Sequence, residues 1–256
     1  MTPSKPARRR FCARILAASS TLLLTGCDRL SQSKWFPKML AQEEQLSAGA
    51  QHFVTARASL AQEFTVADLS PEFRSNGTAN PNNPHYQALA ANGFVDYRLQ
   101  ITGLVEHPAA LSLSELRALA SRTQITRHDC VEGWSAIGKW KGTQLSALLD
   151  VVRPQSNARY VVFFCADPMS DGGPQYYESI DLEDAYHPQT ILAYELNDRD
   201  LPIRNGAPLR VRVERQLGYK MAKYIMGIEL VEDFVHIGDG KGGYWEDRGY
   251  EWYAGI

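Results

Sequence analysis

The stretch Tyr160-Val161-Val162-Phe163-Phe164-Cys165 (YVVFFC) is a nearly continuous apolar run. A short run of this kind, rich in β-branched and aromatic side chains, predicts a buried strand. Residues 97–105 (YRLQITGLV) alternate apolar and polar side chains, which predicts a half-buried strand. Residues 191–196 and 209–213 are expected to form further strands, and Asn197-Asp198 a turn after the first of them.

Fewer segments have the features of helices. Ser112 and Glu115 form a capping box that opens a short helix carrying Leu116 and Leu119. Residues 144–152 place leucines at a helical spacing, whereas residues 76–84 (NGTANPNNP) are typical of a loop. Strands outnumber helices and no strict βαβ alternation appears, so we predict an α+β domain with a mixed sheet rather than a doubly wound fold.

Composition excludes several classes of protein. The chain has 256 residues, 44% of them hydrophobic and 22% charged, which excludes disordered, collagen-like and coiled-coil proteins. Lys and Arg number 27 against 29 Asp and Glu, so the net charge is -2 and a nucleic-acid partner is not expected. Four cysteines are too few for a scaffold built on disulfides.

The N-terminus resembles an export signal. Arg8-Arg9-Arg10 precedes an apolar run, residues 15–24, which is shorter than the roughly 20 residues needed to span a bilayer. Paired arginines before Phe11 are typical of a twin-arginine signal. Residues 24–27 (LTGC) resemble a lipobox, so we expect a periplasmic or envelope protein, lipid-anchored at Cys27; alternatively the signal is ordinary and Cys27 incidental.

These features predict four segments. We expect an export signal over residues 1–26, a tether with a peripheral segment over 27–75, the folded domain over 76–235 and an aromatic-rich tail over 236–256. The tail is expected to pack onto the domain, and its alternative role is a partner surface.

The densest group of reactive side chains is Arg127-His128-Asp129-Cys130-Val131-Glu132-Gly133-Trp134. A cysteine among such polar neighbours is unlike a buried structural cysteine. In an extended segment, His128 and Cys130 project to the same side. Cys130 is therefore a candidate nucleophile, a soft metal ligand or half of a disulfide with Cys165. No CxxC or HExxH motif supports a zinc site.

A second group of motifs lies downstream. Residues 205–210 read NGAPLR and residues 218–223 read GYKMAK. Taken alone, they are compatible with a Gly-Pro turn and strands with basic residues facing solvent. Together with CVEGW and WKG, in this order and spacing, they resemble the molybdopterin-binding domain of the sulfite oxidase superfamily over residues 80–231. The bacterial methionine sulfoxide reductase branch is the most similar.

This resemblance implies a molybdenum–molybdopterin cofactor and a set of site residues. Cys130 would be the thiolate ligand of molybdenum and therefore a free cysteine. The positions implied to contact the cofactor are Asn82, His85, Tyr86, Cys130, Cys165, Asn205, Arg210, Met221, Ala222 and Lys223. Cys165 departs from the pattern, because the reductase branch has threonine there.

The implied chemistry is a two-electron oxygen-atom transfer to or from a small substrate, such as sulfite, a sulfoxide or an N-oxide, with more weight on a reductase. Arg127 and His128 are candidates to meet the substrate oxygen; alternatively, they orient the Cys130 loop through hydrogen bonds.

The resemblance also bears on partners. The sequence has no haem CxxCH motif or iron–sulfur cysteine set, so electrons are expected to pass to or from a separate protein, by analogy a membrane haem b subunit. A sulfite-oxidase-type dimerisation domain and homodimer are not expected. Two other functions stay open, a binding lipoprotein without catalysis and a thiol-dependent hydrolase or peroxidase using Cys130 and His128, but neither explains NGAPLR and GYKMAK.

Overall fold

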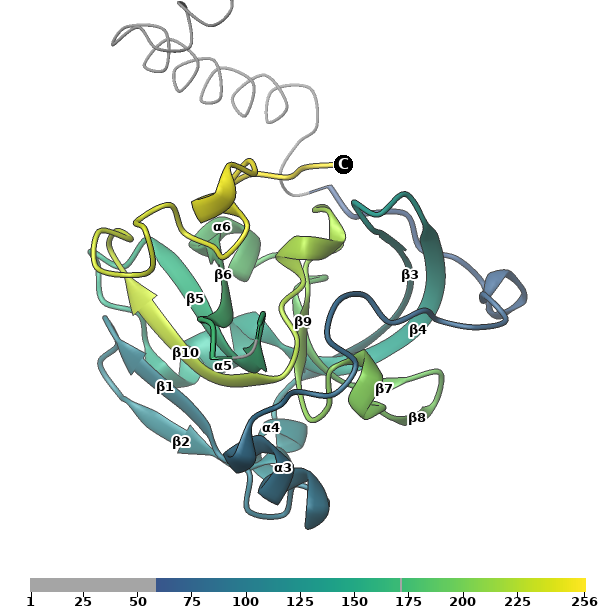
Figure 1. The fold of residues 1–256 in the computed structure, drawn as a ribbon, viewed down its shortest axis with the longest axis horizontal. Helices are drawn as coiled ribbons and strands as arrows, with labels where there is room; N and C mark the ends of the chain where they lie inside the picture. Colours follow the sequence, from purple (N-terminus) through teal and green to yellow (C-terminus); the bar gives the residue numbers. More distant parts are fainter. Residues whose placement is uncertain (1–58, 171) are drawn as a thin grey trace, which may run out of the picture. The chain divides into compact units, whose positions relative to one another are not determined.

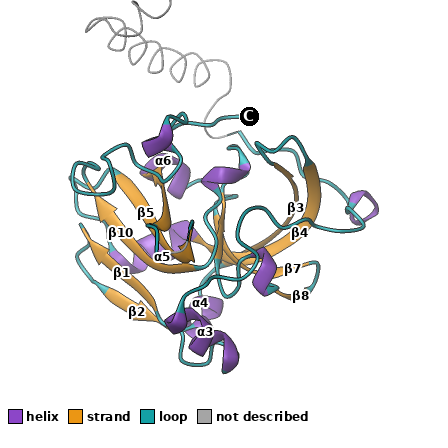
Figure 2. Ribbon diagram, in the orientation of Figure 1, coloured by secondary structure: helices purple, strands orange, loops and turns teal. Residues whose placement is uncertain are grey.

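Two β-sheets organise the chain in a computed structural model that describes residues 59–170 and 172–256 (Figures 1 and 2). The predicted export signal, the lipid site at Cys27 and the first part of the predicted tether lie outside the described residues. Among the described residues, no helix is both long and apolar enough to cross a membrane.

The first sheet has the strand order β2-β1-β10-β5-β6. Its strands are β1 (Leu99–Gly103), β2 (Ala109–Leu111), β5 (Tyr160–Pro168), β6 (Gln175–Asp181) and β10 (Ile225–Val231). Strands β1 and β10 are parallel and the other pairs antiparallel, so the sheet is mixed. The apolar run at 160–165 forms most of β5, which lies between β10 and β6 as a buried strand should.

The second sheet has the order β3-β4-β7-β8, with β9 also paired to β7. Its strands are β3 (Ser121–Asp129), β4 (Ser135–Gln144), β7 (Ile191–Leu196), β8 (Arg199–Asp200) and β9 (Arg210–Arg212). Strands β3 and β4 form a long hairpin, paired from Ser121 opposite Thr143 to Asp129 opposite Ser135. The five-residue connection of this hairpin contains Cys130, so the two strands place that cysteine.

Short helices connect the strands. The α-helices are α3 (Pro84–Ala91), α4 (Leu113–Ala118), α5 (Leu145–Val152) and α6 (Leu182–Ala185). Single 3-10 turns are η1 (Val66–Asp68), η2 (Ile203–Asn205), η3 (Gly218–Lys220) and η4 (Glu246–Arg248). Helix α4 begins with the predicted capping box, because the Ser112 side chain accepts from Glu115 N and the Glu115 carboxylate from Ser112 N. The α+β prediction is confirmed.

The main core lies against the first sheet. Helix α5 buries Leu145, Leu148, Leu149 and Val152 in one cluster with side chains of β1, β5 and β10. A second cluster surrounds Trp140 of β4 and includes residues of β7.

The folded domain begins before the predicted boundary at residue 76. Ala61 N donates to Gln189 Oε1 at 2.7 Å and Phe64 N to Ile125 O at 2.8 Å. Phe73 is buried in the Trp140 cluster. The described part of the predicted tether therefore belongs to the domain. Its backbone groups form hydrogen bonds with β3 and with Gln189, just before β7, and its Phe73 side chain packs in the Trp140 cluster.

The aromatic tail packs on the first sheet. Tyr244 N donates to Tyr177 O at 3.0 Å, and Trp252 Nε1 donates to Ser179 Oγ at 2.9 Å. Both acceptors belong to β6, so the tail covers this strand, the end of the sheet.

Candidate active site

Cys130 lies in the tight turn of the β3–β4 hairpin. Its N–H donates to Trp134 O at 3.0 Å, and Gly133 N donates to Cys130 O at the same distance. Gly133 has a φ of 83°, which a glycine adopts at no steric cost. The thiol is nearly buried and lines a pocket of about 190 Å³. Burial raises the pKa of Cys130, while the Glu132 backbone, Arg74 and Arg210 act in the opposite direction.

Segments far apart in the sequence form the other walls of this Cys130 pocket. They are the 76–78 loop, the end of β5, the start of β6, the 219–223 segment and the tail. The lining residues are Asn76, Gly77, Thr78, Cys130, Val131, Glu132, Asp167, Met169, Tyr176, Tyr219, Met221, Ala222, Lys223, Trp245 and Tyr250. Cys130 and the GYKMAK motif, predicted to act together, therefore share one pocket.

Lys223 fastens the 76–78 loop to the pocket. Its buried ammonium donates to the carbonyl oxygens of Asn76 and Thr78 and lies 3.3 Å from Ser75 Oγ. Burial, together with the nearby Arg210 guanidinium, lowers the pKa of Lys223 to about 7. Its donors are already used by protein oxygens, so Lys223 shapes the pocket wall.

Cys165 lies behind the pocket. Its buried thiol accepts a hydrogen bond from the backbone N–H of Lys223, and burial raises its pKa well above the ordinary value. Cys130 and Cys165 are both free thiols. Cys165 therefore contacts the GYKMAK backbone without lining the pocket.

Arg210 connects the two downstream motifs. Its guanidinium is buried and donates to Asn205 O at 3.0 Å and to Met221 O at 3.3 Å. The Asn205 amide donates in turn to Phe73 O at 3.4 Å. Burial and the neighbouring Arg212 lower the pKa of Arg210 to about 9. The NGAPLR segment is thus buried and supports the 219–223 wall of the pocket through hydrogen bonds. This differs from the alternative interpretation, in which the basic residues of these motifs face solvent.

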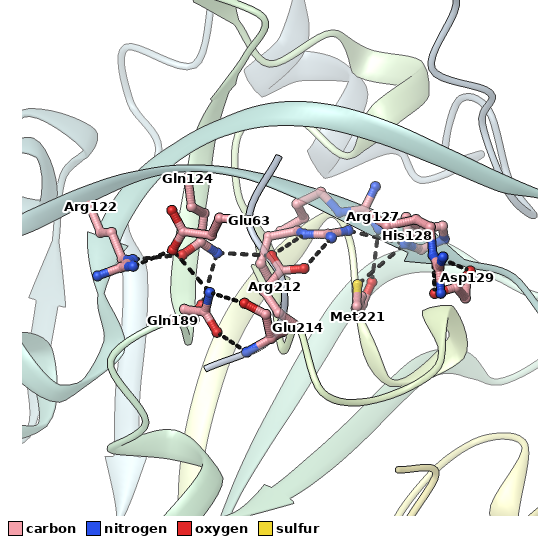
Figure 3. A network of polar contacts seen from close by, with 12 residues as sticks. Glu63, Arg122, Gln124, Arg127, His128, Asp129, Gln189, Arg212, Glu214 and Met221 are labelled. Atoms are coloured by element: carbon pink, nitrogen blue, oxygen red, sulfur yellow. Dashed lines mark hydrogen bonds and ion pairs between the residues drawn. The ribbon is translucent and has the colours of Figure 1, made fainter. Parts of the chain in front are cut away.

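His128 is part of an internal polar network that reaches the same wall (Figure 3). Arg212 Nη1 donates to His128 Nδ1 at 3.0 Å, and Met221 Sδ lies 3.2 Å from that nitrogen. Burial and Arg212 lower the pKa of His128 well below its ordinary value, so the ring is neutral with its hydrogen on Nε2. His128 therefore accepts from Arg212, touches Met221 Sδ without a hydrogen bond, and does not line the pocket.

The network extends away from the pocket through carboxylate and amide groups. Glu214 accepts two bonds from Arg212, at 2.9 and 2.6 Å, and one from Gln124 Nε2 at 2.8 Å. Figure 3 shows these contacts continuing through Gln189 and Glu63 toward Arg122. The network thus reaches His128 through Arg212, at the same ring nitrogen that Met221 Sδ approaches.

Arg127 lies outside the Cys130 pocket. Its side chain is exposed and pairs with Asp129 at 2.9 Å, and Ser135 Oγ donates to the same carboxylate. Strand alternation turns Arg127 away from the side on which His128 is buried. Neither Arg127 nor His128 lines the Cys130 pocket, in which they were expected to meet the substrate oxygen. The alternative, in which both orient the Cys130 loop, stays a prediction.

The upstream residues are placed apart from Cys130. Asn82 and His85 are exposed, and His85 lines a different pocket, with Asn83, Arg98 and Gln175 among its walls. Tyr86 is buried, and its hydroxyl donates to Ala207 O at 2.6 Å, in the NGAPLR loop. These three positions are not brought into the Cys130 pocket.

Several pocket residues were missed by sequence reasoning. Asp167 follows the apolar run of β5 and is buried, and burial raises its pKa to about 7. Tyr176, Trp245 and Tyr250 also line the pocket. The available signal for Asp167 was a carboxyl group directly after the apolar run of β5, where a buried polar group needs a partner.

The donor set fits a polar cofactor bound through a soft metal. Asn76 Oδ1 and Asp167 Oδ1 are buried without a hydrogen-bond partner, and both residues line the Cys130 pocket; Arg210 Nε is also unpartnered, but Arg210 is not part of the lining. Buried polar atoms of this kind call for a bound partner. In the described part of the chain, no three His, Cys, Asp or Glu side chains gather to hold a bare metal ion. Cys130 offers the soft ligand that can ionise to a thiolate, whereas Met169 and Met221 offer thioethers.

Comparison with known proteins identifies the family. Residues 86–236, more than half of the chain, match the oxidoreductase molybdopterin binding domain. The chain belongs to this molybdopterin oxidoreductase family. The resemblance inferred from CVEGW, NGAPLR and GYKMAK is thereby confirmed, and so are the cofactor and the enzyme class: the protein is a molybdenum-dependent oxidoreductase.

Two curated relatives of this molybdopterin oxidoreductase are named as protein-methionine-sulfoxide reductases. A putative protein-methionine-sulfoxide reductase subunit YedZ1 from Azospira oryzae is 36% identical, over 98% of this chain and 88% of its own. The protein-methionine-sulfoxide reductase catalytic subunit MsrP from Xanthomonas axonopodis is 39% identical, over 88% and 70%. The sulfane dehydrogenase SoxCD from Paracoccus pantotrophus aligns with 54% of this chain and 39% of its own, at 22% identity and a TM-score of 0.49.

Proposed function

We propose that this molybdopterin oxidoreductase reduces a sulfoxide, such as an oxidised methionine side chain, with molybdenum bound through Cys130. Two relatives that cover most of the chain are named as protein-methionine-sulfoxide reductases. The observation that carries the choice of substrate is the charge and polarity of the Cys130 pocket.

The pocket favours a neutral substrate over an anion such as sulfite. Lys223 is the single cationic side chain among its described lining residues, and its donors are taken by protein oxygens. Glu132 and Asp167 contribute two carboxyl groups to the same lining. Since like charges repel strongly where water is scarce, a dianion is disfavoured beside these groups.

The pocket walls fit the two alkyl groups of a sulfoxide. Met169, Tyr219, Trp245 and Tyr250 present apolar and aromatic surface to the pocket. Such surface binds apolar groups and leaves only the sulfoxide oxygen to be satisfied by polar atoms.

The protein residues hold the cofactor in defined roles. Cys130 ligates the metal, the Met221-Ala222-Lys223 backbone forms the adjoining wall, and Asn205 and Arg210 brace that wall from behind. Cys165 supports it through the Lys223 N–H. When bound, the cofactor supplies the two-electron oxygen-atom exchange, while the protein supplies binding and orientation.

We also propose that the enzyme works in the periplasm, exported by the twin-arginine signal and tethered by lipid at Cys27. Electrons then come from a separate membrane haem b subunit. The paired arginines, the LTGC sequence and the lack of haem and iron–sulfur motifs support this arrangement.

Steady-state kinetics of the cofactor-loaded enzyme test the proposed substrate. With a reduced viologen dye as electron donor, we expect reduction of methionine sulfoxide. With an electron-accepting dye, we expect sulfite oxidation at least tenfold lower in kcat/KM. Sulfite oxidation that is faster than sulfoxide reduction contradicts the proposal.

A further inference from the structure

A buried group of three charged side chains, the Glu178–Lys220–Glu246 cluster, lies next to the Cys130 pocket. Lys220 Nζ contacts Glu178 Oε1 at 2.5 Å and Glu246 Oε1 at 2.6 Å, and each side chain is at most 1% exposed. The three residues come from β6, η3 and η4. Their neighbours Tyr176 and Tyr219 both line the pocket.

The cluster has two carboxyl groups for one ammonium group. An uncompensated buried charge is costly, so the cluster is most stable when one carboxyl keeps its proton. Burial, reinforced by Glu246 and opposed by Lys220, raises the pKa of Glu178 well above its ordinary value. The raised pKa of Glu178 and the contact of its Oε2 with the Tyr176 hydroxyl both favour Glu178 as the carboxyl that keeps the proton.

Tyr176 lies between the Glu178 carboxyl and the Cys130 pocket. Its hydroxyl donates its single hydrogen to the Tyr219 carbonyl oxygen, an atom that can only accept. The same hydroxyl oxygen lies 3.4 Å from Glu178 Oε2. Because the hydroxyl hydrogen is already used, this contact is favourable when Glu178 Oε2 carries the hydrogen and donates it. Because Tyr176 also lines the Cys130 pocket, it lies between Glu178 and the pocket.

We propose that Glu178 and Tyr176 deliver a proton to the substrate pocket during turnover. Sulfoxide reduction consumes two protons, since R₂S=O + 2 H⁺ + 2 e⁻ gives R₂S + H₂O: the S–O bond breaks, sulfur is reduced, and the oxygen leaves as water. The electrons come from the reduced redox partner or dye. One proton passes from the Glu178 carboxyl to the Tyr176 oxygen, whose own hydrogen rotates into the pocket, and the second comes from solvent. Solvent also returns a proton to Glu178 between turnovers.

Several titratable groups face Glu178 from the elements packed against it. They are Tyr176 and Tyr177 on β6, Cys165 on β5, Tyr219 and Lys220 on η3, and Glu246 on η4. Burial raises the pKa of each of these tyrosines and of Cys165, so they stay neutral while Glu178 titrates. Lys220 and Glu246 are the charged groups that shift the pKa of Glu178: Lys220 lowers it and Glu246 raises it.

The pH dependence of kcat with excess reduced dye tests the path. For the wild-type enzyme we expect kcat to fall on the alkaline side, as Glu178 loses its proton. Glu178→Gln should lower kcat about tenfold to a hundredfold and remove this alkaline fall, since general acids contribute about that much or more. Tyr176→Phe, which removes only the hydroxyl, should lower kcat similarly.

Glu246→Gln is the matched control, because it removes a carboxylate from the same Lys220 without touching Tyr176. Lys220 then pairs with Glu178 alone and favours its ionised form, so the alkaline fall should remain and move to lower pH. A merely structural cluster would change melting temperature and molybdenum content in both variants and leave the pH profile unmoved.

An infrared titration gives a readout that does not depend on activity. A protonated-carboxyl C=O band should disappear as pH rises in the wild-type enzyme and be missing in Glu178→Gln. The proposal is overturned if Glu178→Gln or Tyr176→Phe, with normal molybdenum content, keeps wild-type kcat and pH profile. This proton path rests on the proposed function, but the path and the function can fail separately. An enzyme that only oxidises sulfite would refute the proposed substrate. The same variants would then show whether Glu178 and Tyr176 accept the protons that sulfite oxidation releases.

Discussion

At the scale of single residues, the site depends on which side of a strand each side chain occupies. The polar surroundings of Cys130 marked it from the sequence as more than a structural cysteine, and the structure places it in the pocket. Arg127 and His128 were adjacent candidates that the structure separates, because strand alternation buries one and exposes the other. His128 is the buried one because it packs against Met221 and Arg212. These partners lie about 90 residues away in the sequence, so no local pattern could predict the contact.

A substitution at Gly218 tests the close contact between His128 and the GYKMAK segment. A Cβ at this position would lie 2.4 Å from His128 Nε2 and 3.1 Å from Asp129 O. Gly218→Ala should therefore lower the free energy of unfolding by about 1–3 kcal/mol and reduce molybdenum content. Denaturant unfolding and metal analysis measure both. Gly227→Ala is the control, since its Cβ would meet nothing nearer than 3.7 Å; an equal loss there would argue against a specific contact.

Tyr250 tests the aromatic wall of the pocket. Its ring stacks on Trp245 with centroids 5.2 Å apart. Tyr250→Ala should raise KM for a sulfoxide about twofold to tenfold, as expected for an aromatic contact worth about 0.5–1.5 kcal/mol. Tyr186, equally exposed at 41% and outside the pocket, provides the control variant Tyr186→Ala. Equal KM values for the two variants would exclude Tyr250 from substrate binding.

At the scale of elements, the strands that could be predicted are those with a local run or alternation of apolar residues. The predicted strand at 191–196 coincides with β7, and the predicted helix at 144–152 with α5 to within one residue. Strands β3, β4, β6 and β10 were not predicted. Strand β6 (QYYESID) illustrates the reason, because its buried Glu178 is balanced by Lys220 and covered by the tail, partners that lie 42 or more residues away.

The link between β6 and the tail can be tested at Lys220. Lys220→Met leaves two carboxyl groups in a dry site without their ammonium, which should cost about 3–5 kcal/mol of stability. Lys139→Met breaks the partly exposed pair with Asp198, at 2.7 Å, and should cost less than about 1 kcal/mol. Thermal unfolding of the two variants compares them, and similar losses would show that the buried cluster does not hold the tail.

At the scale of the whole molecule, Asp167 and Lys223 make stability depend on pH in opposite directions. The pKa of Asp167 is raised to about 7, so the unfolded chain releases that proton first and stability falls as pH rises from about 4 to 7. The pKa of Lys223 is lowered to about 7, so the unfolded chain holds more protons above that pH and stability rises again toward pH 10.

Cofactor-free protein should therefore show a contribution from this pair with a minimum near pH 7, and each limb should have a slope of up to about 1.4 kcal/mol per pH unit. Asp167→Asn should flatten the acid limb; because the Asp167 carboxylate raises the pKa of Lys223, the alkaline limb should remain and begin at a lower pH. Urea unfolding at a series of pH values measures the two limbs. An unaltered acid limb in the variant would assign it to other groups.

The family and cofactor could be predicted from the sequence because CVEGW, NGAPLR and GYKMAK keep their order and spacing over most of the domain. The charge and walls of the pocket could not, since they are assembled from the 76–78 loop, β5, β6 and the tail. The choice of a neutral sulfoxide depends on that assembly rather than on any single motif.

Molybdenum and pterin content per chain is the most direct test of the central claim, that Cys130 holds the cofactor of a sulfoxide reductase. Protein from a molybdopterin-producing host should contain about one molybdenum and one pterin, as the family requires. Cys130→Ser should lose the metal and the sulfoxide reductase activity together, whereas Cys165→Ser, the other free thiol of the domain, should keep both. Full molybdenum and full activity in Cys130→Ser would contradict the account.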